Sequence, residues 1–311
     1  MTLGILTGLL AALCQSLCYL ITRHYVQKRP AGASRQLLVL GHLWMGVFSL
    51  ILLPFVWHGT LADVLSALQP LIATAMFYLI GQFAFLIALK HVEPSRASPL
   101  LGFKIVVLAV MASFVAQPHA TGTPDPVVGL TLMQWGGVVL CCIAAVALNF
   151  SGNQLRRGAI LAIGFACVVY SFSDWNIAIL VNQLHDFTPK AVAPFYATAL
   201  TYLLTALIAL AFLPAYGTRD KIAWRDSAPW AVAWFLAMIF LYTCFGLIGP
   251  VLGNILQSSR GLISILLGSL FVYLGHLHIE PIYGKGVFVR RLAAGILMFA
   301  AVILYALGKP H

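Results

Sequence analysis

The amino-acid sequence predicts an all-α membrane protein whose ten transmembrane helices form two inverted five-helix repeats. Three observations lead to this fold class: the composition, ten long apolar runs and a weak internal duplication. The chain has 311 residues, of which 61% are hydrophobic and only 8% are charged, and its mean hydropathy is +0.97. A helix that crosses a bilayer needs roughly 20 apolar residues, whereas a soluble core cannot bury so much apolar surface. A soluble globular protein is therefore excluded.

The apolar runs give the expected boundaries of the spans in chain order. In the first half they are Leu3–Ile21, Leu37–Trp57, Leu68–Leu89, Ala97–Ala116 and Val127–Phe150. In the second half they are Ala159–Val181, Ala193–Ala215, Trp230–Gly253, Gly261–His276 and Val287–Leu307. The runs are continuous rather than alternating, which favours helices over a transmembrane β-barrel. The short connections leave no room for a soluble catalytic domain.

The boundary between the eighth and ninth spans has two interpretations. Gly249-Pro250 is either the turn between them or a kink inside the eighth span. We favour the kink, because proline is tolerated in a membrane helix where neighbouring groups satisfy the freed carbonyl. The turn is then the polar run Asn254, Gln257, Ser258, Ser259 and Arg260.

A weak duplication divides the chain into a first repeat at 1–150 and a second at 156–311, both within one membrane unit. Ser95-Arg96-Ala97 opens the fourth expected span and Ser259-Arg260-Gly261 opens the ninth. Leu9–Val26 aligns with Gly164–Val181 without gaps. An odd number of spans per repeat forces the two halves into opposite orientations, an arrangement that many transporters share.

The loop charges predict an orientation in the membrane. The connections after every odd-numbered span hold 14 Lys or Arg, while the opposite side holds three, namely Lys190, Arg260 and Lys309. The positive-inside rule places the richer side in the cytoplasm, so that both termini face outward. The expected location is a bacterial inner (plasma) membrane. The net charge of +10 then points to anionic lipid headgroups as partners, and no nucleic acid is expected.

One segment resembles a known family. The run Ala88-Leu89-Lys90-His91-Val92-Glu93-Pro94-Ser95-Arg96-Ala97-Ser98-Pro99-Leu100-Leu101 is similar to the third-to-fourth helix junction of the EamA-type drug/metabolite transporter superfamily. Leu274-Gly275-His276-Leu277-His278-Ile279-Glu280 resembles the short stretch before that family's last helix. The resemblance implies a ten-helix secondary transporter. Typical members are basic at the N-terminus and keep both termini in the cytoplasm, whereas this chain has no Lys or Arg before Arg23.

Two charged residues are the first candidates for a functional site. Asp174 lies midway through the sixth expected span, and Lys104 lies about two helical turns into the fourth. Charges at membrane depth are costly and usually serve a function. Asp174 is either a proton-coupling site or an anchor for a substrate ammonium group, and Lys104 either binds a substrate anion or extends to the headgroups. Together they could hold a zwitterion. The structural alternative for Asp174 is hydrogen bonding between helices.

Polar and aromatic residues on the same spans complete the candidate substrate site. They are Gln82, Tyr78, Tyr170, Trp175, Ser16, Tyr19 and Tyr242. A ligand cavity needs a few placed polar groups on an apolar wall. Interhelical hydrogen bonding is the structural alternative for each of them.

The sequence as a whole predicts a secondary transporter that moves a small polar or amphipathic metabolite by alternating access. No phosphate-binding Walker motif is present, so the driving force is expected to come from a proton, another solute or the substrate gradient itself. Amino acids are one possible cargo. A passive channel or a lipid scramblase is the main alternative. A membrane enzyme acting on lipid-linked substrates is less favoured, because no nucleophile-base or metal motif is present, and no metal or cofactor is expected. The sequence leaves the oligomeric state open.

Overall fold

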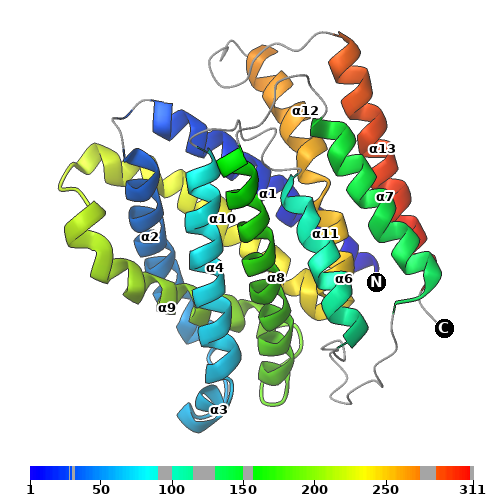
Figure 1. Ribbon diagram of the computed structural model, residues 1–311. Coiled ribbons are helices and arrows are strands. Elements are labelled where there is room, and N and C mark those ends of the chain that lie inside the picture. Colours follow the sequence, from blue (N-terminus) through cyan, green and yellow to red (C-terminus); the bar gives the residue numbers. More distant parts are fainter. Residues whose placement is uncertain are drawn as a thin grey trace.

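The structure is a computed structural model that describes residues 1–27, 29, 32–89, 100–114, 130–149, 157–273 and 285–308. Every regular element within these ranges is helical (Figure 1). Six of the helices are long and apolar enough to cross a membrane: Thr2–Val26, Ala33–Val56, Leu68–Ala88, Arg157–His185, Ala193–Tyr216 and Lys221–Ile248. The chain is therefore an all-α membrane protein, and these six helices coincide with six of the ten expected spans. The count of ten stays a prediction.

The first half of the chain holds α1 (Thr2–Gln27), α2 (Ala33–Val56), α3 (Leu61–Ser66), α4 (Leu68–Leu89), a 3₁₀ turn at Leu101–Phe103 that continues into α6 (Lys104–Phe114), and α7 (Leu132–Asn149). The short helix α3 was not expected. It forms because the Thr60 side chain accepts the backbone N–H of Asp63 while the Asp63 carboxylate accepts the backbone N–H of Thr60. This reciprocal arrangement is a capping box.

The second half holds α8 (Arg157–His185), α9 (Ala193–Tyr216), α10 (Lys221–Ile248), α11 (Pro250–Gln257), α12 (Arg260–Tyr273) and α13 (Lys285–Leu307). Helix α10 begins at Lys221 rather than at Trp230, because the Asp220 side chain caps it by accepting the backbone N–H groups of Ile222 and Ala223. A side-chain acceptor at this position satisfies donors that a helix start leaves unpaired.

The preferred kink at Gly249-Pro250 was wrong, because α10 ends there. Gly249 has φ +80°, a backbone conformation that glycine adopts without steric cost, and Pro250 is the first residue of α11. The chain changes direction at this point (Figure 1). Of the polar run expected to form the turn, Asn254 and Gln257 are helical, and Ser258-Ser259 alone separate α11 from α12.

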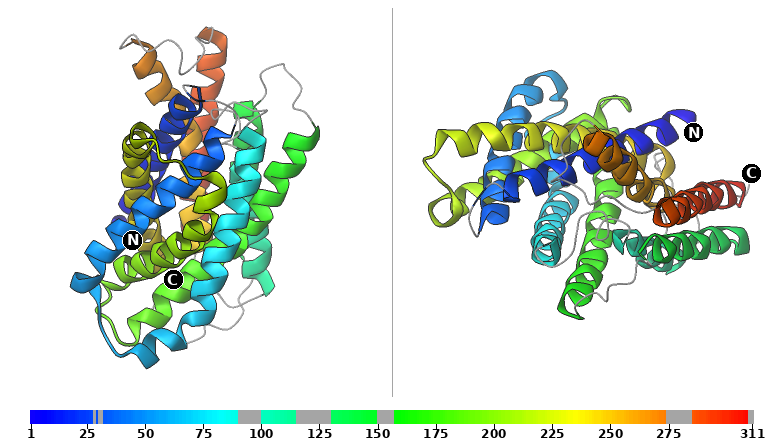
Figure 2. Two further views of the ribbon diagram at one scale, coloured as in Figure 1. Left: turned by 90° about the vertical axis from the view of Figure 1, so that its left-hand side faces the viewer. Right: turned by 90° about the horizontal axis from the view of Figure 1, so that it is seen from above.

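The most extensive helix contacts join the two halves of the chain. α1 packs on α10, α2 on α9, α4 on α8 and α7 on α13. Figure 2 shows α7 and α13 side by side at one edge of the molecule. Small residues permit this close packing, since a Cβ at Gly46 of α2 would lie 2.3 Å from the Cβ of Ala206 in α9.

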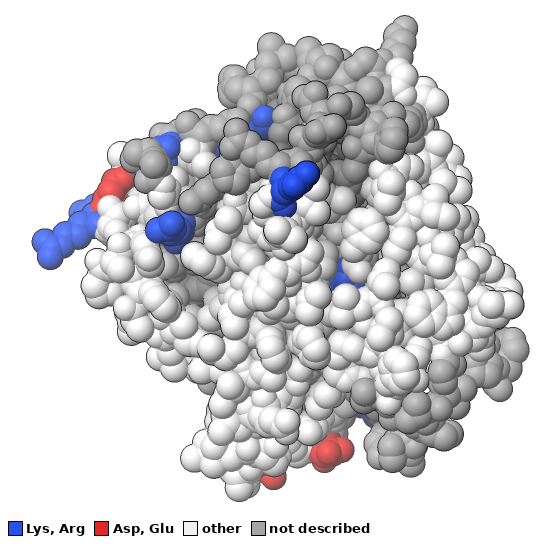
Figure 3. All heavy atoms as spheres, viewed as in Figure 1, with Lys and Arg blue, Asp and Glu red and all other residues white. Residues whose placement is uncertain are grey.

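The outer surface matches a lipid environment. Large apolar side chains point outward along several helices, among them Phe55, Phe114, Leu132 and Leu161, each more than 70% exposed. Figure 3 shows one face on which charged side chains are few, with most of the Lys and Arg toward one end. The two segments that resemble the transporter family lie mostly outside the described residues, which exclude 90–99 and 274–284.

Candidate functional site

A small polar cavity lies between helices of both halves of the chain. Its volume is about 40 Å³, and its polar lining comes from α1, α4, α6, α8, α9, α10 and α12. The polar and aromatic side chains that line it are Gln15, Tyr19, Tyr78, Lys104, Tyr170, Ser173, Asp174, Tyr202, Trp234, Tyr242 and Arg260. A water molecule needs roughly 10–15 Å³ of such space. The cavity therefore has room for a few water molecules at most.

Two residues that line the cavity, Lys104 and Asp174, form an ion pair. The Lys104 Nζ donates to Asp174 Oδ2 at 2.7 Å, and the two side chains are 7% and 6% exposed. The Asn254 Nδ2 donates to the same carboxylate oxygen at 2.9 Å. Lys104 therefore does not extend to the headgroups, and the two charges expected to hold a zwitterion are paired with each other.

The local backbone positions both members of this pair. Lys104 is the first residue of α6 and follows the 3₁₀ turn directly. The Ser171 hydroxyl of α8 donates to the Lys104 carbonyl at 3.0 Å, which joins α8 to the start of α6 one helical turn before Asp174. Ser173 donates to the Thr74 carbonyl of α4 at 3.0 Å. The turn of α8 that precedes Asp174 is thus hydrogen-bonded to both α6 and α4.

A second cation, Arg260, lines the same cavity and is only 4% exposed. Its Nη1 donates to the Gln15 amide oxygen at 2.6 Å and to the Tyr19 hydroxyl at 3.3 Å. Its Nε donates to the Gln257 carbonyl at 2.8 Å. The prediction that Arg260 is a loop charge was wrong. The break between α11 and α12 instead places its side chain inside the protein.

Aromatic rings form most of the remaining wall. Tyr78 lies 6.4 Å from Tyr170 and 6.2 Å from Trp234 between ring centroids, and Trp234 donates to the Tyr202 hydroxyl at 3.0 Å. The Tyr170 hydroxyl donates to the Gln82 amide oxygen. The hydroxyl groups of the wall are therefore polar contacts on an otherwise apolar surface, as ligand cavities commonly have.

A buried histidine extends the polar contacts away from the cavity. His42 is fully buried, with Nδ1 2.7 Å from the Leu38 carbonyl oxygen and Nε2 3.1 Å from the Tyr78 hydroxyl. A carbonyl oxygen can only accept, so Nδ1 carries a proton, and in the neutral ring Nε2 accepts from Tyr78. His42 was not among the predicted site residues.

The structure brings together six of the nine predicted site residues at the cavity: Asp174, Lys104, Tyr78, Tyr170, Tyr19 and Tyr242. Gln82 lies behind them as the partner of Tyr170. Ser16 and Trp175 do not line the cavity. The Ser16 hydroxyl donates to the Ala12 and Arg260 carbonyls, and Trp175 belongs to the apolar core.

The side chains at the site that were missed in the sequence prediction include Arg260, Asn254, Ser173, Tyr202 and Trp234. The signal for Asn254 was the Gly-Pro pair that precedes it, because the helix restarted at Pro250 carries it inward. Arg260 follows a second break, at Ser258-Ser259, and begins α12. Nothing distinguishes Tyr202 and Trp234 from other aromatic residues of the spans.

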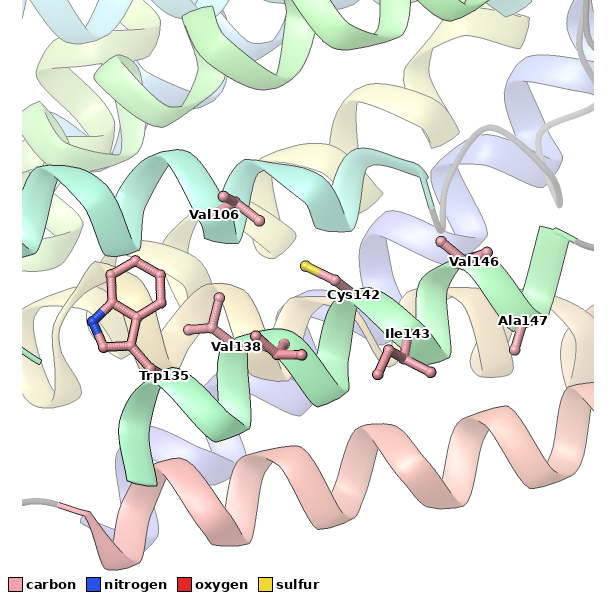
Figure 4. A pocket seen from close by; sticks show the side chains of 8 residues that line it. Val106, Trp135, Val138, Cys142, Ile143, Val146 and Ala147 are labelled. Carbon is pink, nitrogen blue, oxygen red and sulfur yellow. The ribbon is translucent and has the colours of Figure 1, made fainter. Parts of the chain in front are cut away.

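A second hollow, between α6 and α7, is a different feature. It measures about 650 Å³ and is lined by Val106, Trp135, Val138, Val139, Cys142, Ile143, Val146 and Ala147. Figure 4 shows Val106 of α6 across from the residues of α7. Only carbon and sulfur groups and one indole line it, so it offers no set of polar groups for recognition. We interpret it as lipid-facing surface.

Comparisons with known proteins bear on the fold alone. No protein-family model matches the chain, and no curated protein matches it. A solved structure titled "Crystal structure of protein" aligns with 98% of this chain and 96% of its own chain, with a TM-score of 0.64 and 16% sequence identity. Similarity at this identity shows a shared fold and assigns no function.

Proposed function

We propose that the chain is a secondary transporter of the drug/metabolite superfamily type, with ten spans, that moves a small polar or amphipathic metabolite by alternating access. The observation that carries the proposal is the buried Lys104–Asp174 ion pair inside a polar cavity between the two halves of the chain. Charged groups in the membrane interior are costly and mark substrate or ion pathways. A purely structural core gains little from them.

The helix pairing supports two inverted repeats. If α1, α2 and α4 of the first half correspond to α8, α9 and α10 of the second, the contact of α1 with α10 becomes that of α8 with α4. The contact of α2 with α9 maps onto itself, and so does that of α7 with α13. A two-fold relation between the halves produces this pattern, and transporters of this architecture bind cargo at the repeat interface.

The ion pair also supports a coupling role for Asp174. While Asp174 accepts from Lys104 and Asn254, both helices that carry these donors are held to α8. A proton on Asp174, or a counter-solute anion on Lys104, removes the attraction and releases α8. The proposed transporter therefore changes conformation when the pair is broken.

The charge distribution supports an orientation. The two connections that meet at one end of the protein, where Arg29 pairs with Asp220 and Asp226, carry basic residues in them or at the helix starts that follow: Arg29, Arg35, Arg219, Lys221 and Arg225. By the positive-inside rule this end is cytoplasmic, and the termini are outside. A bacterial inner (plasma) membrane is the proposed location.

A two-step experiment tests the transporter proposal. Purified protein is first screened for thermal stabilisation by amino acids, organic acids, amines and sugar phosphates, because a ligand that binds the folded state raises its stability. The compound with the largest effect is then used in counterflow assays in liposomes. We expect saturation and trans-stimulation, both lost in Asp174→Asn and retained in the exposed control Asp186→Asn. Flux without saturation or trans-stimulation would show a channel, and lipid movement without solute flux would show a scramblase.

A further inference from the structure

The charges at the cavity do not balance. Lys104 and Arg260 contribute two positive charges and Asp174 one negative charge. The Lys104 Nζ is committed to Asp174 at 2.7 Å, whereas no carboxylate among the described residues lies within ion-pair distance of the Arg260 guanidinium. The cavity therefore carries one uncompensated positive charge in a nearly dry environment.

The partners of Arg260 are all neutral. Its Nη1 and Nε bind an amide oxygen, a hydroxyl and a backbone carbonyl, and no hydrogen bond among the described residues uses Nη2. The carbonyl belongs to Gln257 at the C-terminal end of α11, which supplies only a partial negative charge. A guanidinium removed from water without a full counter-charge is costly, by several kcal/mol. Selection for binding explains such a residue better than selection for stability.

We propose that the cargo is an organic anion whose carboxylate binds Arg260, with its apolar body against the tyrosine wall of Tyr19, Tyr78 and Tyr170. The guanidinium fork matches a carboxylate, and one such group brings the cavity to neutrality. A zwitterion leaves the excess positive charge in place, and a cation increases it. The inference rests on the proposed function for the movement of the anion, but the binding itself can be measured without transport.

The size of the cavity adds a condition. At about 40 Å³ it does not accommodate an aromatic or branched acid, so the wall has to widen before the anion enters.

Three probes that share a phenylethyl group and differ in charge test the proposal. They are 3-phenylpropionate (anion), phenylalanine (zwitterion) and 2-phenylethylamine (cation), each titrated against purified protein with thermal stability as readout. We expect stabilisation by the anion alone. In Arg260→Gln its affinity falls roughly 10-fold or more, the loss expected for one charge-assisted hydrogen bond. Arg260→Lys keeps part of the affinity, and the exposed control Arg225→Gln keeps all of it.

The outcomes separate this inference from the transporter proposal. Preferential binding of the zwitterion or the cation, unchanged anion affinity in Arg260→Gln, or no binding of the anion below about 1 mM would each overturn the anion site. If Arg260→Gln does not fold, the wild-type probe series and Arg260→Lys still decide. Anion binding without counterflow in liposomes leaves the site standing and rejects the carrier. Counterflow of an amine or an amino acid supports the carrier and rejects the anion site.

Discussion

The Asp174 carboxylate accepts hydrogen bonds from two buried donors, and substitutions of these residues should therefore change the free energy of unfolding in a way that can be predicted. Its partners Lys104 and Asn254 come from α6 and α11, so three helices meet at one oxygen atom. A buried ion pair is weak evidence for stability, because desolvation offsets most of the attraction, yet removing one partner leaves the other charge unpaired. The pair is therefore expected to behave as a unit.

A double-mutant cycle measures that unit. Asp174→Asn leaves the Lys104 ammonium without a counter-charge and is expected to lower the free energy of unfolding by about 3–5 kcal/mol. The double variant Asp174→Asn/Lys104→Met removes both charges and is expected to recover most of the loss. Thermal or denaturant unfolding in detergent reports both values. Additive losses in the double variant would contradict the pairing.

Asp220 gives a pH-dependent prediction outside the membrane. The hydrogen bond from the Ile222 backbone N–H, with those from Arg29 and Ala223, holds the pKa of Asp220 below its ordinary value. A carboxyl group with a lowered pKa stabilises the folded state above its unfolded pKa of about 4, and this contribution is lost as the pH falls through the folded pKa. In Asp220→Asn, the free energy of unfolding measured against pH should therefore fall less steeply below pH ~4 than in the unsubstituted protein.

At the scale of helices, the positions of Asn254 and Arg260 depend on two breaks in the chain. Gly249 ends α10, and Ser258-Ser259 end α11, whose eight residues are all buried. The first break is possible because glycine tolerates the positive φ, and the second leaves the Gln257 carbonyl free to accept from Arg260. The positions of the Asn254 and Arg260 side chains at the site thus depend on where α10 and α11 end.

Close helix packing predicts different effects on stability for alanine substitutions at two glycines. Gly46→Ala places a methyl group 2.3 Å from the Ala206 Cβ, so α2 and α9 have to separate, and we expect a loss of about 1–3 kcal/mol. Gly164→Ala on α8 meets no atom within 4 Å. It should leave the stability unchanged or raise it by up to ~1 kcal/mol, because alanine favours helix. Thermal unfolding of both variants checks the contrast, which equal effects would refute.

At the scale of the whole molecule, the halves of the chain are interleaved, so each half packs mainly on the other. The small polar cavity lies between them, and the connections at one end are joined by Arg29, whose Nη2 lies 3.0 Å from Asp226 Oδ2 and whose Nη1 lies 3.4 Å from Asp220 Oδ2. In an alternating-access cycle, the end that opens has to break these contacts.

A crosslink across that end tests whether it opens. In the double variant Arg29→Cys/Asp226→Cys, a flexible bismaleimide should join the start of α10 to the segment after α1 and abolish counterflow. Each single variant treated in the same way is the control, because the six native cysteines are buried or half-buried. Full transport by the crosslinked protein would show that this end stays closed throughout the cycle.

Much of the fold could be predicted from sequence because hydropathy is a local property. The runs at Ala193–Ala215 and Leu68–Leu89 became helices with nearly the expected boundaries. The boundaries of α10 could not be predicted in the same way, because they depend on the cap at Asp220 and on the conformation of Gly249. The two residues of the capping box that forms α3, Thr60 and Asp63, are present in the sequence, but apolar runs alone do not predict this short helix.

For the candidate site, the sequence was sufficient to single out Asp174 and Lys104 as candidates, because a charged residue within an apolar run is unusual whatever its tertiary position. Their contact was beyond its reach, since the two residues are 70 positions apart and belong to different helices. Arg260 shows the same limit of prediction from sequence for a charge that lies outside the apolar runs. It looked like a loop charge because it follows a polar run, and only the packing of α1 against α11 and α12 encloses it.

The sequence by itself determined that this protein is helical and resides in a membrane, because both properties follow from the summed hydropathy of consecutive residues. The tertiary structure decided which charges are paired and which is left over. That outcome depends on helices distant in the chain converging on one small volume, where a counter-charge is either present or absent.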